Sequence, residues 1–156
     1  MRGVSLHELS AVELGRGYAA GAFSPLDVAQ SVIAHAERCE PKLHALWAFD
    51  PEATLAMARE STARWQRGEA RGALDGVPVT IKENIATRGL PLPLGTAATT
   101  LVPAAADAPP AARLREAGAV FIAKTTMPDY GMLSSGLSSF HALTRNPWDL
   151  TKNPGG

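Results

Sequence analysis

Two short apolar segments separated by a helical one are the feature that most constrains the fold. In residues 77–82, apolar side chains alternate with proline, threonine and lysine, which is the period-two pattern of a strand. Residues 119–123 form an apolar run rich in branched and aromatic groups, as in a buried strand. Between them, Asp107 is placed to cap a short helix that runs through Ala117. This strand-helix-strand order requires a crossover, so the sequence predicts an α/β fold with a partly parallel sheet.

Three helices are predicted before the first strand, because each of three segments opens with a capping signal and continues with helical spacing. They cover about residues 5–20, 24–41 and 50–66, and Pro41 and Gly68 are expected to end the second and third. Glycine and proline recur through 86–108 and 128–156, which predicts loops. No linker is evident, so we expect a single domain over 1–156, with a helical layer in 1–72 and the sheet and active-site loops beginning in 73–156.

The charge of the chain indicates the class of ligand, and its cysteine content indicates the cellular compartment. The 156 residues include 15 basic and 15 acidic side chains, which are interspersed and leave no basic patch for nucleic acid or for an anionic membrane. The expected ligand is a small molecule. Cys39 is the single cysteine, so no disulfide can form within the chain, which fits a reducing compartment. Since no signal peptide or membrane span is indicated, we expect a cytoplasmic protein.

Lys82 is the most informative single residue, because it ends the predicted strand over 77–82. Ligands of α/β proteins bind at strand ends. A lysine held there among apolar neighbours loses hydration, which lowers its pKa and makes the neutral amine available as a proton acceptor. The alternative is a surface lysine paired with Glu83.

The serines of residues 131–139 could line a pocket or supply a nucleophile, or they could satisfy backbone groups of the loop. The segment does not contain the G-x-S-x-G nucleophile elbow, and no S-x-x-K motif occurs in the chain. The four histidines are scattered and do not form H-E-x-x-H. We therefore expect neither a metal nor another cofactor.

Four motifs taken together resemble the amidase-signature family of hydrolases, and their order and spacing also match. The likeness extends over roughly residues 74–156, and the earlier helix beginning at Ser24-Pro25 is similar to the family's N-terminal region. The motifs are LDGVPVTIKEN at 74–84, REAGAV at 115–120 with AKT at 123–125, RNPWD at 145–149 and NPGG at 153–156.

The resemblance implies an α/β/α fold in which helices flank a mixed sheet. It also implies hydrolysis of carboxamides through a serine acyl-enzyme, in which a lysine base, a serine in a cis peptide and a nucleophilic serine act in series. Lys82 matches the lysine, and Met132, Ser134 and Ser135 match the stretch that lines the acyl site.

In the family both catalytic serines follow the Pro-Gly-Gly motif, which here ends at Gly156. The resemblance therefore implies that residues 1–156 are the N-terminal part of the enzyme and are inactive alone. The remaining residues would belong to the same polypeptide, in the same chain or as a second one.

Two alternatives remain open. The first is the A-type subunit of a glutamine-dependent tRNA amidotransferase, whose members tend to carry an acidic residue near the position of Leu137. The second is a non-catalytic binding module derived from the family. A well-folded monomeric chain of 156 residues would favour the binding module, because a truncated parallel sheet exposes an apolar edge.

Overall fold

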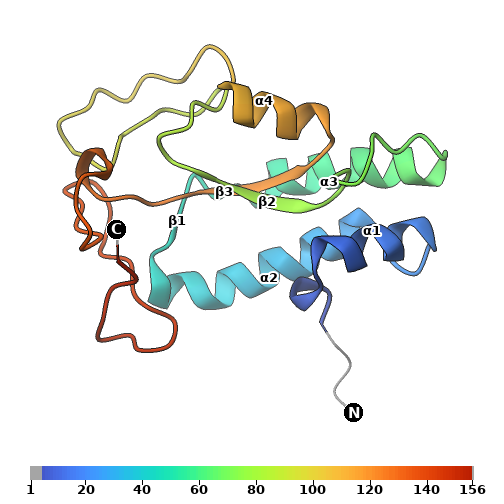
Figure 1. Ribbon diagram of the computed structural model, residues 1–156, viewed down its shortest axis with the longest axis horizontal. Coiled ribbons are helices and arrows are strands. Elements are labelled where there is room, and N and C mark those ends of the chain that lie inside the picture. The colour runs from blue at the N-terminus through green and yellow to red at the C-terminus, as the bar shows by residue number, and fades with distance from the viewer. Residues whose placement is uncertain (1–4, 156) are drawn as a thin grey trace. The chain divides into compact units, whose positions relative to one another are not determined.

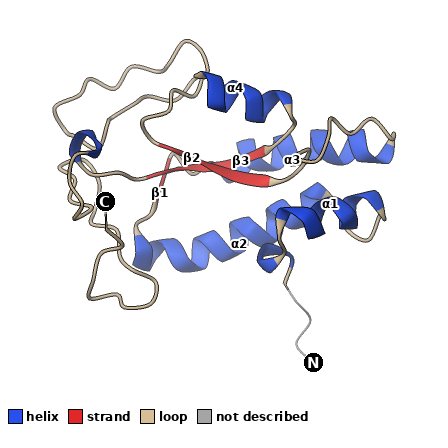
Figure 2. Ribbon diagram, viewed as in Figure 1, coloured by secondary structure: helices blue, strands red, loops and turns tan. Residues whose placement is uncertain are grey.

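The computed structural model describes residues 5–155, shown in Figures 1 and 2. Gly156, the last residue of the Pro-Gly-Gly motif, lies outside the described residues. The strands are β1 (Leu46–Trp47), β2 (Pro78–Lys82) and β3 (Val120–Thr125). The helices are η1 (Leu6–Glu8), α1 (Ala11–Ala19), α2 (Pro25–Leu43), α3 (Pro51–Gln66), α4 (Pro109–Glu116) and η2 (Asp129–Gly131).

The three strands form one mixed sheet in the order β1-β3-β2. β1 pairs with β3 in antiparallel register, with Leu46 opposite Thr125. Hydrogen bonds from the Val120 N–H to the Val77 carbonyl, and from the Glu83 N–H to the Thr125 carbonyl, show that β2 and β3 run in the same direction. The predicted mixed sheet with flanking helices is confirmed. β1 was not predicted, since a strand of two residues has no periodicity to detect.

The prediction of one helix over residues 5–20 is wrong in one respect, because the helix is interrupted between η1 and α1. Ser10 adopts an extended conformation and caps α1, accepting a hydrogen bond from the Glu13 N–H while the Glu13 carboxylate accepts one from the Ser10 N–H. A second capping box therefore starts a new helix five residues after the first one at Ser5.

The other helices follow the predictions more closely. α3 has the predicted bounds, with the Asp50 carboxylate accepting from the Ala53 N–H. The prediction that Pro41 ends the second helix is wrong, because α2 continues two residues further, to Leu43. α4 begins at Pro109, two residues after Asp107, and the Asp107 carboxylate accepts from the Arg88 N–H.

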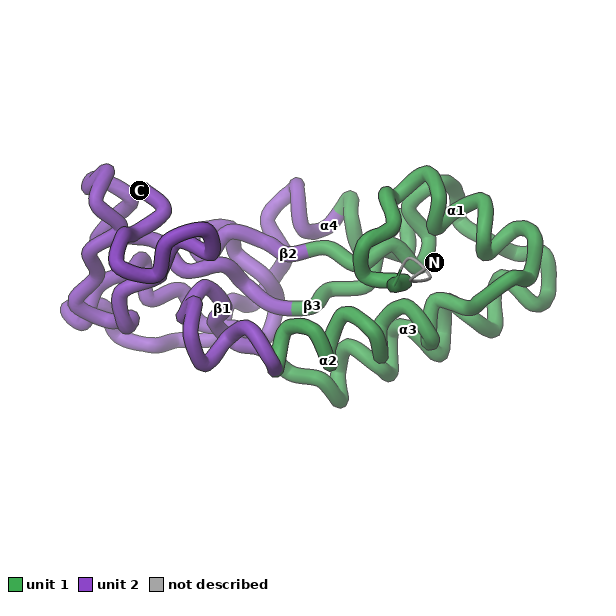
Figure 3. The backbone as a smooth tube through the Cα atoms, turned by 90° about the horizontal axis from the view of Figure 1, so that it is seen from below, with its two compact units in different colours: residues 1–37, 50–79, 113–122 green, residues 38–49, 80–112, 123–156 purple. Residues whose placement is uncertain are grey.

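The described chain forms two compact units, drawn in different colours in Figure 3. Unit 1 comprises the described part of 1–37 with 50–79 and 113–122; unit 2 comprises 38–49, 80–112 and the described part of 123–156. The division of a single domain into 1–72 and 73–156 stays a prediction. None of the helices within 5–155 combines the length and apolarity needed to cross a membrane.

Unit 1 has an apolar core between its N-terminal helices. Leu14 and Tyr18, four residues apart on α1, pack with Val28 of α2, and all three are buried. The Tyr18 hydroxyl donates to the Gly76 carbonyl at 3.0 Å, just before β2. The Thr54 hydroxyl donates to the Phe121 carbonyl at 2.9 Å, which ties α3 to β3. These contacts hold the starts of both parallel strands within the unit.

Unit 2 is organised around the residues that follow β3. The Thr126 N–H donates to the Ala45 carbonyl at 3.0 Å, and the Thr126 hydroxyl shares a 2.8 Å hydrogen bond with the Thr144 hydroxyl. The Thr144 hydroxyl donates in turn to the His44 carbonyl at 2.7 Å. Three segments far apart in the sequence therefore meet beside the ends of β2 and β3.

Candidate active site

Lys82 is the last residue of β2, as the sequence predicted. Ile81 and Glu83 on either side of it are buried, whereas the Lys82 side chain is exposed. Successive residues of a strand face opposite sides, so Lys82 points away from the side that buries its two neighbours. The Lys82 carbonyl accepts from the Ile85 N–H at 3.0 Å, which turns the chain directly after the strand.

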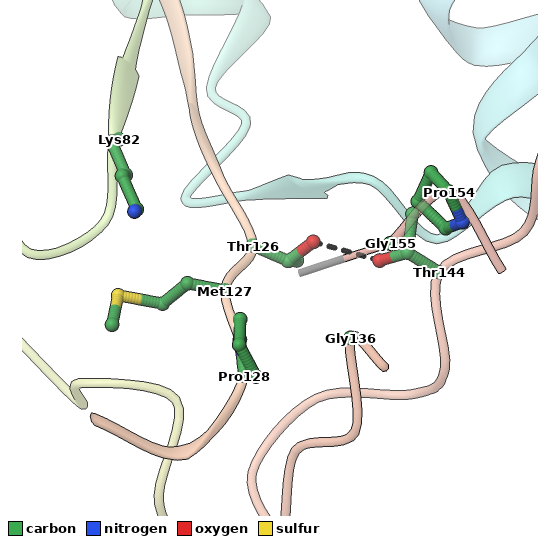
Figure 4. Close-up of a pocket in the computed structure, with 8 residues that line it drawn as sticks. All are labelled: Lys82, Thr126, Met127, Pro128, Gly136, Thr144, Pro154 and Gly155. Atoms are coloured by element: carbon green, nitrogen blue, oxygen red, sulfur yellow. Dashed lines mark hydrogen bonds between the residues drawn. The ribbon is translucent and has the colours of Figure 1, made fainter. Parts of the chain in front are cut away.

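The Lys82 amine opens onto a small pocket of unit 2 with a volume of about 100 Å³. Figure 4 shows the lysine on one side and the segment after β3 on the other. The lining includes two threonine hydroxyls and, among the described residues, no serine. Besides Lys82, the lining residues are Thr126, Met127, Pro128, Gly136, Thr144, Pro154 and Gly155.

The environment of Lys82 differs from the sequence-based expectation in two ways. The side chain is exposed, so the described residues do not enclose the amine among apolar neighbours. The alternative pairing with Glu83 is also not formed, because the Glu83 carboxylate binds His141 and the Gly95 N–H. Chemically, the pocket presents a primary amine that can accept a proton when it is neutral.

The three predicted substrate contacts lie in the loop that follows η2. Met132 is 82% exposed, Ser134 is exposed and Ser135 is half-buried. None of the three lines the Lys82 pocket, although Gly136 does. Their role as substrate contacts therefore stays a prediction.

The next two serines, Ser138 and Ser139, form hydrogen bonds with groups of neighbouring loops. This agrees with the alternative in which the serines of this segment satisfy backbone groups of the loop. The Ser138 hydroxyl donates to the Gly95 carbonyl and accepts from the Phe140 and His141 N–H groups. The Asp129 carboxylate accepts from the Ser139 N–H at 2.8 Å and from its hydroxyl at 3.0 Å. These side chains fix the loop at 136–141 against the segments that contain Gly95 and Asp129.

Two charged residues near Lys82 are buried, which was not predicted from the sequence. Glu83 has no exposed surface, and Lys124 in β3 is 1% exposed. The Lys124 amine donates to the Ile85 carbonyl at 2.7 Å. Burial lowers the pKa of Lys124, and the Glu83 carboxylate opposes this shift. The strand alternation that exposes Lys82 could have indicated a buried Glu83; nothing in the sequence pointed to a partner at His141.

Comparison with known proteins defines the family. A profile described as Amidase matches residues 27–156, which include Lys82 and the whole of the pocket lining. The chain belongs to the amidase family. The mixed sheet and its flanking helices agree with this assignment.

Two relatives of the amidase chain illustrate the sequence similarity, and both are A subunits of a glutamyl-tRNA(Gln) amidotransferase. The chain is 39% identical over 153 residues to the one from Carboxydothermus hydrogenoformans, covering 98% of this chain and 32% of the relative. It is 38% identical over 144 residues to the one from Anaeromyxobacter sp. (strain K), covering 92% of this chain and 29% of the relative. The amidase chain thus spans about a third of the length of these relatives.

Solved amidase structures share the fold. The peptide amidase from Stenotrophomonas maltophilia superimposes with a TM-score of 0.86 at 27% identity, over 96% of this chain and 32% of that one. A second structure, described as an amidase, gives a TM-score of 0.85 at 30% identity, over 95% of this chain and 34% of that one.

Proposed function

We propose that this chain is the lysine-bearing N-terminal part of an amidase that hydrolyses the carbon-nitrogen bond of small carboxamides. Lys82 acts as the general base. A serine in a cis peptide and a nucleophilic serine complete the catalytic set, and by resemblance to the family both follow the Pro-Gly-Gly motif.

The observation that carries this proposal is the composition of the Lys82 pocket. Lys82 and the Pro154–Gly155 pair line the same pocket. In the amidase-signature family, the matching Pro-Gly-Gly leads directly into the serine-rich loop. A serine a few residues further along the chain would therefore start close to the Lys82 amine.

The proposed mechanism uses Lys82 only as a carrier of protons. The neutral amine accepts a proton from the cis-peptide serine, which in turn takes the proton of the nucleophilic serine as that oxygen attacks the substrate carbonyl. The protonated Lys82 then returns a proton, through the cis-peptide serine, to the leaving nitrogen. Water afterwards hydrolyses the acyl-enzyme.

Residues 1–156 alone are inactive on this proposal, because the described pocket contains no serine. The rest of the catalytic set comes from further sequence of the same polypeptide, whether in one chain or in a second. We propose a cytoplasmic enzyme that acts on a small molecule, since the charges are balanced and Cys39 is the lone cysteine.

The test is amide hydrolysis by the natural full-length protein, its Lys82→Ala variant and the 1–156 chain, on a panel of aliphatic and aromatic amides. Because Lys82→Ala removes the general base, it is expected to lower kcat/KM about 10²- to 10⁴-fold. Lys152→Ala is the matched control, since the Lys152 side chain is 72% exposed and forms an exposed ion pair with Asp149 at 3.4 Å. It should leave kcat/KM unchanged.

Activity in the 1–156 chain would overturn the assignment of the nucleophile to later sequence. Full activity in Lys82→Ala would remove the lysine from the mechanism. No hydrolysis by the full-length protein of any amide, including glutamine, would count against the hydrolase itself.

A second candidate is the A-type component of a glutamine-dependent tRNA amidotransferase. It is favoured by the two relatives named above, at 39% and 38% identity, against 27% and 30% for the two solved amidases. Leu137, where such proteins tend to be acidic, argues the other way. Glutamine hydrolysis that requires a co-purifying partner protein would support this candidate, whereas hydrolysis of simple amides by the isolated protein would support the amidase.

A further inference from the structure

Glu83 is a fully buried carboxylate directly after the proposed base. Its two oxygens have different partners: the Gly95 N–H donates to Oε1, and His141 Nε2 contacts Oε2. A buried charge is stable only when it is paired and hydrogen-bonded. These two contacts therefore fix the conformation of loops that are separate in the sequence.

Gly95 connects this carboxylate to the wall of the Lys82 pocket. Its N–H donates to Glu83, and its carbonyl accepts from the Ser138 hydroxyl. Its φ of +68° is one that glycine adopts readily, and a Cβ there would overlap the carbonyls of Met127 and Pro128. Met127 and Pro128 line the pocket. A shift of Gly95 would therefore move the wall that faces the lysine.

The His141 side chain is buried and packs against two aromatic rings. Its side chain is 7% exposed, and its ring makes edge contacts with Trp47 and Phe140 at centroid distances of 6.2 and 4.9 Å. Its backbone N–H donates to the Ser138 hydroxyl at 2.8 Å. In this orientation the ring places Nε2 against the Glu83 carboxylate.

The buried Lys124 interacts electrostatically with Glu83. Through an Nε2 proton, the His141 imidazole can donate to the second carboxylate oxygen of Glu83.

We propose that Glu83 and His141 form a positioning pair for Lys82, in which His141 donates to Glu83 and thereby fixes Gly95 and the pocket wall at Met127–Pro128. The inference rests on the proposed function for its kinetic consequence. The pair does not contact the substrate. It keeps Lys82 and the opposite wall of the pocket in fixed positions. In enzymes, a misplacement of the reacting groups by about 1 Å can lower the rate about 100-fold.

Two substitutions of His141 separate the hydrogen bond from the packing of the ring. His141→Gln keeps an N–H donor near the position of Nε2 and loses the ring, whereas His141→Phe keeps the ring contacts and loses the donor. In the full-length protein we expect His141→Phe to lower kcat at least about tenfold with KM within about threefold, and His141→Gln to stay within about threefold of the wild type for both. His44→Asn is the control, since the His44 side chain is exposed and asparagine tolerates its positive φ of 49°.

Hydrogen exchange provides a readout that does not need activity. The peptide over 83–96 contains the Ile85 and Gly95 amides, which are bonded to the Lys82 carbonyl and to Glu83. Its exchange should rise at least about tenfold in His141→Phe and stay near the wild-type rate in His141→Gln, with the α3 peptide over 51–66 unchanged in both. If His141→Phe does not fold, Glu83→Gln, which replaces the acceptor oxygen facing His141 by an amide nitrogen, should give the same loss of kcat and the same local exchange.

The outcomes are distinct from those for the proposed function. Equal losses in His141→Gln and His141→Phe, a loss in His141→Gln alone, or wild-type exchange in both would overturn the positioning pair. If the full-length protein hydrolyses no amide, the proposed function fails, and the exchange experiment alone decides whether the pair fixes the loop.

Discussion

The buried ion pair between Arg64 and Asp75 in unit 1 gives the sharpest stability prediction. Asp75 has no exposed surface, and Arg64 donates to both of its oxygens, at 2.9 and 2.6 Å. The Ser61 hydroxyl and the Arg71 N–H add hydrogen bonds of 2.6 and 2.9 Å. Arg64→Met keeps most of the side-chain length and removes the charge. Breaking a buried pair in this way destabilises proteins by about 3–5 kcal/mol.

The expected loss depends on pH in a defined direction. Burial on its own raises the pKa of Asp75, but the hydrogen bonds from Arg64, Ser61 and Arg71 outweigh it and lower the pKa. A carboxyl with a lowered folded-state pKa contributes stability above its unfolded pKa, and that contribution disappears as the pH falls through the folded value. Without Arg64 the pKa of Asp75 rises. The difference between wild type and variant should therefore be largest at about pH 7 and shrink towards about pH 3.

Urea unfolding followed by circular dichroism, at several pH values, measures this difference as a change in the free energy of unfolding. Arg67→Met is the control on the same helix end, because Arg67 and its partner Glu69 have side chains that are 57% and 60% exposed. Such exposed pairs contribute about 0–1 kcal/mol. A loss below about 1 kcal/mol for Arg64→Met at pH 7, or one that does not vary with pH, would refute the reasoning.

Two further substitutions test the packing around the site and the core. Gly95→Ala should lower both the melting temperature and kcat, because a positive φ is unfavourable for alanine and its Cβ overlaps the Pro128 carbonyl; a wild-type melting curve would contradict the tight approach. Tyr18→Phe should destabilise unit 1 by about 1 kcal/mol, as seen in urea unfolding, since the Gly76 carbonyl loses its 3.0 Å donor; no change would mean that water replaces the hydroxyl.

Local signals in the sequence were sufficient for the regular elements and for the family. The alternation over 77–82 and the apolar run at 119–123 identified both parallel strands, and Asp50-Pro51 identified the start of α3. These patterns are encoded within a few neighbouring residues, which is why they can be recognised without a structure. The four family motifs likewise needed only their order and spacing, and the match over 27–156 confirmed the family.

The tertiary structure alone decided how the strand end is organised. Glu83 and His141 are 58 positions apart, and no local pattern links a glutamate after a lysine to a histidine in a distant loop. The exposure of Lys82 likewise depends on which segments come together beside β2. Burial and pairing are properties of contacts between residues remote in the sequence, so the positions of strands and a lysine could be inferred from the sequence, but the surroundings of that lysine could not.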